Sequence, residues 1–245
     1  MTAPSDSADR AIQTEHPITR IGPAGRVALN DVVLLEESYN LYCNGVLVTD
    51  LHCSPRHLRQ LAIGHLFCRG LLRTAAEVVN LAIEHAPGKI TVEVRPTQEA
   101  REAEAAIPDS DDVRLTADEV HQLQEDFDRR CDLYRATGAA HSSALADRSG
   151  IIIFLEDIAR HNSLDKVIGE MLLQNISPVG KALILSGRMA YDMLGKAASC
   201  GVKLLIAPGA PSYTSIVMAL ERDITLLAFV RKDNINIYSH PQRIL

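Results

Sequence analysis

The stretch Gly150–Gly169, GIIIFLEDIARHNSLDKVIG, joins an apolar run to a polar helix start. The run 151–155 is rich in β-branched residues and too short for a helix, so it predicts a buried strand. Beyond Arg160, the spacing of Leu164 and Ile168 is helical. The polar residues between the two elements therefore lie where open α/β sheets form ligand crevices. A solvated helix start with capping acids explains the same residues without a ligand, and the pattern leaves both interpretations open.

Strands and helices alternate after this stretch, which predicts a largely parallel sheet with helices on its faces. A turn at 147–150 indicates that the central strand is entered through an antiparallel hairpin. The expected strands are 142–146, 151–155, 182–185, 202–207, 224–230 and 234–238, and the expected helices are 160–169, 189–198 and 212–220.

Hairpins and a single helix are expected in the preceding part of the chain. Asn44-Gly45 is a strong hairpin turn, and Ser54-Pro55 predicts an N-cap with proline at the first helical position. Thr116 and Glu119 form a capping box that predicts a second helix. The expected organisation is a mobile tail over 1–25, a small α+β unit over 26–96, a linker over 97–115 and an α/β domain over 116–245.

The composition is that of an ordinary globular protein, with 47% hydrophobic and 23% charged residues. A net charge of −6 disfavours general adhesion to nucleic acid or to an anionic membrane. No apolar run has the length of a membrane span, and the polar start lacks a signal-peptide core. The five scattered cysteines, an odd number, indicate reduced thiols and a cytoplasmic location. Their spacing and that of the histidines fit no metal site.

Cations follow the predicted strands. Arg160, Arg188 and Arg231 come after three of them, and the carboxyl ends of parallel strands meet at one edge of a sheet. Three arginines near helix starts in an acidic protein indicate an anionic, phosphate-bearing ligand. Each arginine on its own is equally explained by a surface position or by an ion pair. His141, in a stretch of small residues, is as readily structural as functional.

Five motifs in the same order resemble those of the FdhD/NarQ family, the sulfur-carrier proteins that serve formate dehydrogenase. EDIARHNSLDKVIG resembles the family motif E-D-V-G-R-H-N-A-x-D-K-x-x-G, and SGRMAYDMLGKA resembles S-G-R-x-S-x-E-x-x-x-K-A. The remaining three are LAIGHLFCRGLL (61–72), TGAAHSSAL (137–145) and LLAFVRKDNINIYSHPQRI (226–244). The resemblance runs from about Val32 to the C-terminus.

The resemblance implies a cytidine-deaminase-like α/β/α mixed sheet without a zinc site, together with a homodimer. It also implies binding of the molybdenum cofactor as its bis-molybdopterin guanine dinucleotide, and transfer of sulfur to that cofactor from a cysteine desulfurase before insertion into formate dehydrogenase. The family's cofactor-binding segment corresponds to Phe229, Val230, Arg231, Lys232, Asp233 and Asn234. We expect Arg160, His161, Asn162, Arg188 and His141 to complete the site.

One family feature is missing. The family carries sulfur as a persulfide on a cysteine of a C-x-x-C loop, but the corresponding stretch, AAIPDSDDVRL (105–115), contains no cysteine. Cys131 is the nearest thiol and the one candidate carrier, although its place on an apolar helix face predicts a core cysteine. Ala139 and Ala159 replace family glycines and restrict the backbone.

Three functions remain open at this point. The first is a cofactor-binding sulfur carrier of the family, and the alternative is a degenerate paralogue that acts as a cofactor or molybdoenzyme chaperone without sulfur transfer. The third is an enzyme acting on a nucleotide, with His161 and Glu156 as an acid–base pair. The sequence does not identify the client enzyme, the number of nucleotides bound or a second protein that supplies the thiol.

Overall fold

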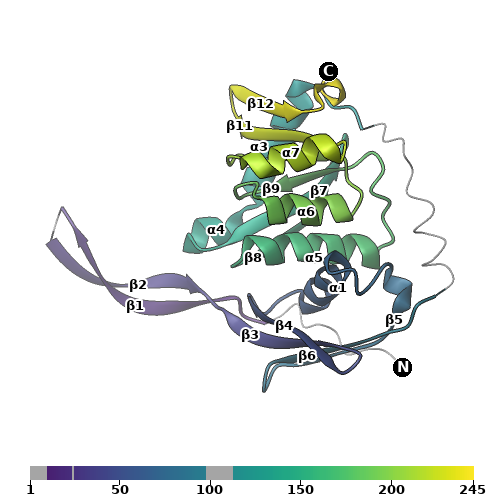
Figure 1. The fold of residues 1–245 in the computed structure, drawn as a ribbon. Coiled ribbons are helices and arrows are strands. Elements are labelled where there is room, and N and C mark those ends of the chain that lie inside the picture. The colour runs from purple at the N-terminus through teal and green to yellow at the C-terminus, as the bar shows by residue number, and fades with distance from the viewer. Residues whose placement is uncertain (1–9, 24, 98–112) are drawn as a thin grey trace.

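The computed structural model describes residues 10–23, 25–97 and 113–245, which form three β-sheets and the helices packed on them (Figure 1). The largest sheet has six strands in the order β12-β11-β10-β9-β7-β8. Its strands are β7 (His141–Asp147), β8 (Gly150–Asp157), β9 (Ala182–Leu185), β10 (Leu204–Ile206), β11 (Thr225–Arg231) and β12 (Asn234–Ser239). The α/β class expected from the alternation is therefore confirmed, as is the mixed sheet that the resemblance implied. The expectation of a largely parallel sheet is wrong, because three of the five strand pairings are antiparallel.

The direction of the strands follows from their pairing. β9, β10 and β11 are parallel, whereas β7 is antiparallel to both β8 and β9, and β12 is antiparallel to β11. β8 to β11 therefore run in one direction even though β7 lies between β8 and β9 in the sheet. The carboxyl ends of four strands lie at one edge, as the alternation predicted.

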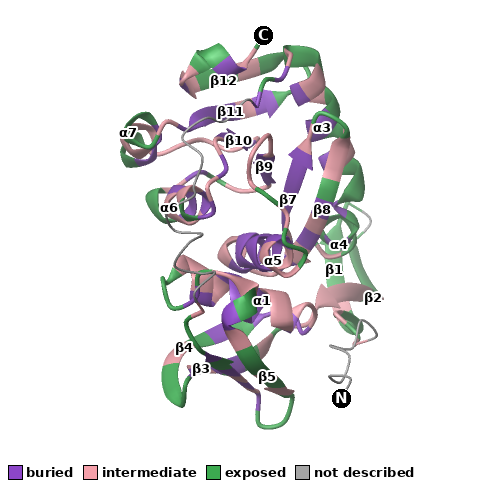
Figure 2. Ribbon diagram, turned by 90° about the vertical axis from the view of Figure 1, so that its right-hand side faces the viewer, coloured by how far each residue is buried: buried purple, intermediate pink, exposed green. Residues whose placement is uncertain are grey.

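Helices cover both faces of this sheet (Figure 2). One face carries α5 (Arg160–Leu173), α6 (Tyr191–Ser199) and α7 (Tyr213–Glu221), and the other carries α3 (Ala117–Arg130) followed by α4 (Asp132–Thr137). Alternate residues of the central strands enter different cores, so Leu183 packs toward α5–α7 and Ile184 toward α3. The capping box predicted at Thr116 and Glu119 begins α3 and is confirmed.

A second sheet has four strands in the order β4-β3-β6-β5. They are β3 (Glu37–Cys43), β4 (Val46–Cys53), β5 (Val78–Glu84) and β6 (Lys89–Val94), with α1 (Leu58–Cys68) packed on one face. The predicted turn at Asn44-Gly45 joins β3 to β4, with positive φ at both residues. Short 3₁₀ turns occur at Ala75–Glu77 and Pro241–Arg243. Helix α1 also packs on α5 and thereby joins the two sheets.

Two expectations for the N-terminal part are wrong. Residues 13–22, expected in the mobile tail, form β1 (Gln13–Gly22), which pairs along its whole length with β2 (Gly25–Leu34) in an antiparallel ribbon that extends from the body (Figure 1). Ser54 does not cap α1, because that helix begins only at Leu58 with His57 as its N-cap. The side chain of Ser54 instead bonds to Asp157 across the sheet boundary. The predicted linker lies largely outside the described residues.

Two further observations concern the cysteines and the apolar character of the helices. All five cysteines are free thiols. Within the three described ranges, no helix combines the length and the apolar character needed to cross a bilayer.

Candidate functional site

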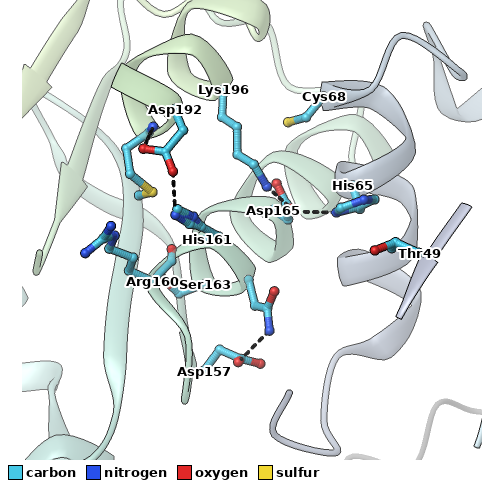
Figure 3. Close-up of polar contacts among 12 residues, drawn as sticks. Thr49, His65, Cys68, Asp157, Arg160, His161, Ser163, Asp165, Asp192 and Lys196 are labelled. Atoms are coloured by element: carbon cyan, nitrogen blue, oxygen red, sulfur yellow. Dashed lines mark hydrogen bonds and ion pairs between the residues drawn. The ribbon is translucent and has the colours of Figure 1, made fainter. Parts of the chain in front are cut away.

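The turn between β8 and α5 is built around the fully buried carboxylate of Asp157. Its oxygens accept hydrogen bonds from the backbone nitrogen of Ala159 at 3.0 Å and from Asn162 Nδ2 at 3.0 Å. Asn162 also donates to the carbonyl of His52 at 2.7 Å, which ties the turn to the four-stranded sheet. These bonds fix the first turn of α5 and therefore the positions of Arg160 and His161 (Figure 3).

A buried cation completes this network. Lys166 Nζ lies 2.6 Å from Asp157 Oδ2, and both side chains are fully buried. The backbone nitrogen and hydroxyl of Ser54 donate to the same oxygen at 3.2 and 3.0 Å. A buried ion pair is tolerated only when further hydrogen bonds satisfy its remaining donors and acceptors, as they do here. Lys166 thus stabilises the turn through its buried contact with Asp157.

A second set of polar contacts joins α5 to its neighbouring helices (Figure 3). His161 Nε2 lies 2.9 Å from Asp192 Oδ2 of α6, and Asp165 Oδ2 lies 2.5 Å from Lys196 Nζ and 3.0 Å from His65 Nδ1. Burial, together with the charge of Lys196, lowers the pKa of His161 despite the neighbouring Asp192 carboxylate.

The proposed acid–base pair of His161 and Glu156 does not form. Glu156 accepts a hydrogen bond from Ser142 Oγ at 3.2 Å, and burial raises its pKa. His161 is engaged with Asp192 on the helical side. The two groups serve different networks, so the structure gives no support to the nucleotide-modifying enzyme.

A cavity of about 470 Å³ opens at the same edge of the sheet, on the side of α3 and α4. His141 begins β7 opposite Asp157, and its Nδ1 lies 3.1 Å from Ser186 Oγ at the end of β9. The Ser186 hydroxyl also accepts the backbone N–H of Ser142 at 2.9 Å. The cavity is lined by Phe127, Asp128, Cys131, Tyr134, Arg135, Ala140, His141, Ser142, Ser186 and Pro208. Its volume lies in the range that holds small molecules.

Arg160 lies beside Gly187 and close to His141, which lines the cavity, although Arg160 is not itself one of the lining residues. A Cβ at Gly187 would lie 3.3 Å from Arg160 Cδ and 3.8 Å from His141 Cε1, so the glycine leaves space for both side chains. Burial and the charge of Arg160 lower the pKa of His141. The buried Nε of Arg160 has no hydrogen-bond partner among the described residues. A guanidinium nitrogen without a partner retains a donor that an anionic group could use.

The segment Phe229–Asn234 lies farther along this edge. Phe229 has a positive φ at a β-bulge, and Val230 donates its backbone N–H to the carbonyl of Ala207 at 3.2 Å. Arg231, Lys232, Asp233 and Asn234 are exposed at the turn between β11 and β12. None of the six lines the cavity. The structure thus brings Arg160 and His141 together, but it places Arg231 two strands beyond β9.

Cys131 lies in the cavity wall and is buried. Its Sγ donates to the carbonyl of Phe127 at 3.3 Å, and burial raises its pKa. The expectation of a core cysteine is confirmed. Its thiol is nonetheless the one that borders this cavity among the five.

Several residues of the two networks and of the cavity wall were not predicted from the sequence. Asp192 and Lys196 stand in the motif SGRMAYDMLGKA, yet only their contacts with His161 and Asp165 reveal their partners. Tyr134 and Arg135 gave no motif signal at all, because they enter the cavity wall through the packing of α4.

Comparison with known proteins gives one consistent result. The model of the FdhD/NarQ family matches residues 34–245. The chain is 30% identical to the sulfur carrier protein FdhD of Shouchella clausii, over 96% of this chain and 98% of that one. It is 32% identical to the Bordetella parapertussis protein of the same name, over 88% of each chain. A crystal structure from Desulfotalea psychrophila, assigned as a formate dehydrogenase accessory protein, superposes with a TM-score of 0.84 at 26% identity and covers 96% of this chain and 100% of its own.

Proposed function

The chain belongs to the FdhD/NarQ family, and from this premise we propose that it is a formate dehydrogenase accessory protein that binds a guanine-nucleotide form of the molybdenum cofactor. The proposed site is the edge of the six-stranded sheet at which β8, β9, β10 and β11 end. The observation that carries the proposal is Arg160, whose buried Nε lacks a partner beside a cavity of about 470 Å³.

The charges along this edge fit such a ligand. Arg188, Arg231 and Lys232 are exposed, and none has an ion-pair partner in the described part of the chain. A guanine dinucleotide carries phosphates, for which arginine is well suited because its planar fork donates two parallel hydrogen bonds. When bound, the cofactor supplies the molybdenum chemistry of the client enzyme.

This chain's own residues would bind and orient the ligand. Asp157 and Lys166 hold the turn that carries Arg160, and Ser186 orients the imidazole of His141. Because burial and Arg160 favour the neutral imidazole, His141 is able to donate or accept one hydrogen bond without adding charge to the site.

Sulfur transfer is the part of the family's function for which this chain offers the least support. No cysteine occurs in 105–115, and Cys131 is buried with a raised pKa. A thiolate is the form that attacks sulfur donors. We therefore propose that the site is retained while the relay is lost or displaced to Cys131. The alternative, a cofactor-binding chaperone without sulfur transfer, is favoured by the same two observations.

Two measurements test these proposals. Binding of GDP to the wild-type protein is measured by calorimetry and compared with Arg160→Ala, with Arg231→Ala and with the control Arg129→Ala on the exposed face of α3. We expect the first two variants to weaken binding about tenfold or more. Wild-type affinity in both would overturn the proposed site.

The relay is tested by intact mass after incubation with a cysteine desulfurase and cysteine. A reductant-sensitive gain of one sulfur that disappears in Cys131→Ser would assign the sulfur relay to that thiol. If the wild-type protein gains no sulfur, the result supports the cofactor-binding chaperone without sulfur transfer. We also expect a cytoplasmic homodimer, in agreement with five free thiols; light scattering measures the assembly.

A further inference from the structure

Two exposed tyrosines stand at the same edge of the sheet, beyond the residues considered so far. Tyr191 is the first residue of α6 and is 58% exposed, and Tyr213 is the first residue of α7 and is 79% exposed. Aromatic residues make up only 4% of this chain, so a pair of them left in solvent on adjacent helices is unusual for its composition. Neither hydroxyl has a hydrogen-bond partner among the described residues.

The backbone joins the two loops that lead into the tyrosines. Met189 and Pro211 form an isolated parallel bridge in which the Met189 N–H donates to Ala210 at 3.0 Å and the Ser212 N–H donates to Met189 at 2.9 Å. Each tyrosine lies two residues beyond this bridge. The helices that they begin pack against each other and lie next to one another in both views (Figures 1 and 2).

The support beneath the tyrosines is rigid. Ser212 caps α7 by accepting from the Ser215 N–H at 3.2 Å, and the buried Ser215 hydroxyl donates to the carbonyl of Met189 at 2.9 Å. At Gly209 a Cβ would lie 2.7 Å from the carbonyl oxygen of Gly187, so the two loops touch through their backbones. Rings on such a support lose little conformational freedom when a ligand covers them.

Charge indicates what kind of ligand fits. Arg188 precedes Tyr191 on the same loop, is exposed and has no ion-pair partner in the described ranges. Exposed aromatic rings near an unpaired guanidinium suit a ligand with a planar ring and a phosphate, because a ring is able to stack on an aromatic face while the phosphate meets the cation.

We propose that Tyr213, with Tyr191 beside it, forms the stacking surface for the base of the bound nucleotide, and that Arg188 contacts the adjoining phosphate. This inference rests on the proposed nucleotide-binding function and assigns residues to the recognition of the base. It predicts that the tyrosines contribute to the affinity for a nucleotide but not to the affinity for a free phosphate group.

The experiment measures binding of GDP and of inorganic pyrophosphate by the full-length protein. Tyr213→Ala is expected to weaken GDP binding about tenfold while leaving pyrophosphate binding at the wild-type level, and Tyr213→Phe is expected to retain the wild-type affinity for GDP. Leu220→Ala, at an exposed position at the other end of α7, serves as the control. The chain has no tryptophan, so Tyr213→Trp introduces a single indole whose fluorescence we expect GDP to quench and pyrophosphate to leave unchanged.

The outcomes separate the two claims. Wild-type GDP affinity in Tyr213→Ala, with Arg160→Ala weakened, overturns the stacking surface and leaves the proposed function standing. Equal loss of GDP and pyrophosphate binding in Tyr213→Ala also overturns it, because a base contact cannot act on pyrophosphate. Failure of the wild-type protein to bind GDP overturns the function and the inference together.

Discussion

Gly64 of α1 and Gly169 of α5 face each other at the closest approach of the two helices. A Cβ on Gly64 would lie 2.8 Å from the Gly169 nitrogen, and a Cβ on Gly169 would lie 2.9 Å from the Gly64 nitrogen. The added atoms would also overlap the carbonyl oxygens of Asp165 and Gln60. This contact lets α1, which belongs to the four-stranded sheet, lie directly on the helix that carries Arg160 and His161.

Alanine at either glycine should therefore destabilise the protein. Gly64→Ala and Gly169→Ala gain about 1 kcal/mol of helix propensity but force the helices apart, and overpacking costs about 3 kcal/mol or more where the clash is with backbone atoms, as it is here. We expect a net loss of about 2 kcal/mol in the free energy of unfolding, measured by urea titration. Gly195→Ala in α6, where a Cβ meets nothing within 4 Å, is the matched control and should be neutral or stabilising. Equal stability of all three variants would contradict the helix contact.

Removal of one partner of the buried ion pair should cost far more than the same change at the surface. Lys166→Met leaves the carboxylate of Asp157 buried without its cation, a change that typically costs about 3–5 kcal/mol. Arg129→Met breaks the exposed pair with Asp126 and should cost less than about 0.5 kcal/mol. Thermal melts of the two variants compare them directly. A small shift for Lys166→Met would mean that water reaches Asp157.

The stability of the protein should fall as the pH drops below the ordinary pKa of histidine, in part because of His141. Burial and the charge of Arg160 lower its folded-state pKa, against a weaker opposing effect of Asp157, while Ser186 bonds Nδ1. Below the unfolded pKa of 6.5 the unfolded state binds the proton more readily, so folding loses free energy as the pH falls toward the folded pKa. Urea titrations at pH 7.5 and 5.5 should show a smaller pH-dependent loss in His141→Gln than in the wild type. An identical loss would refute this role.

The cysteines should react slowly in the folded protein. Burial raises the pKa of every one of them, to about 12 for Cys53 and about 11 for Cys200, and that of Cys131 is raised as well. Because the thiolate is the nucleophile, we expect a thiol-specific disulfide reagent at pH 8 to react at least about tenfold more slowly with native protein than with urea-unfolded protein. A fast native reaction that mass mapping places on Cys131 would contradict this prediction and would favour the displaced sulfur relay.

The sequence predicted those elements whose determinants are local. Thr116 and Glu119 cap one helix through bonds within four residues, and Asn44-Gly45 closes a hairpin through its own backbone angles. The prediction that Ser54 caps α1 was wrong because its partner, Asp157, lies 103 residues away, and no local sequence pattern indicates such a bond. Strand β1 was missed because Pro17 and Gly22 resemble loop punctuation, although an edge strand of a two-stranded ribbon tolerates proline.

The candidate site was predictable in part for the same reason. The order of strands and helices placed Arg160, Arg188 and Arg231 at one edge, because the direction of parallel strands follows from connectivity alone. The distance along that edge depends on strand order, and β7 inserts between β8 and β9 without any signal in the sequence. The cavity wall contributed by α4 depends on tertiary packing, which periodicity does not report.

The shared carboxylate of Asp157 affects how the protein unfolds. Its donors come from both sides, Ser54 from the end of the four-stranded sheet and Lys166 from α5 on the six-stranded one. Separating the two sheets would break the Ser54 bonds and expose the apolar surface that α1 and α5 bury against each other, so a half-open molecule that keeps one sheet and sheds the other is strongly disfavoured. A destabilising change in either part should therefore unfold the whole chain cooperatively. A cellular protease would then encounter either folded or fully unfolded molecules, with few partly unfolded ones.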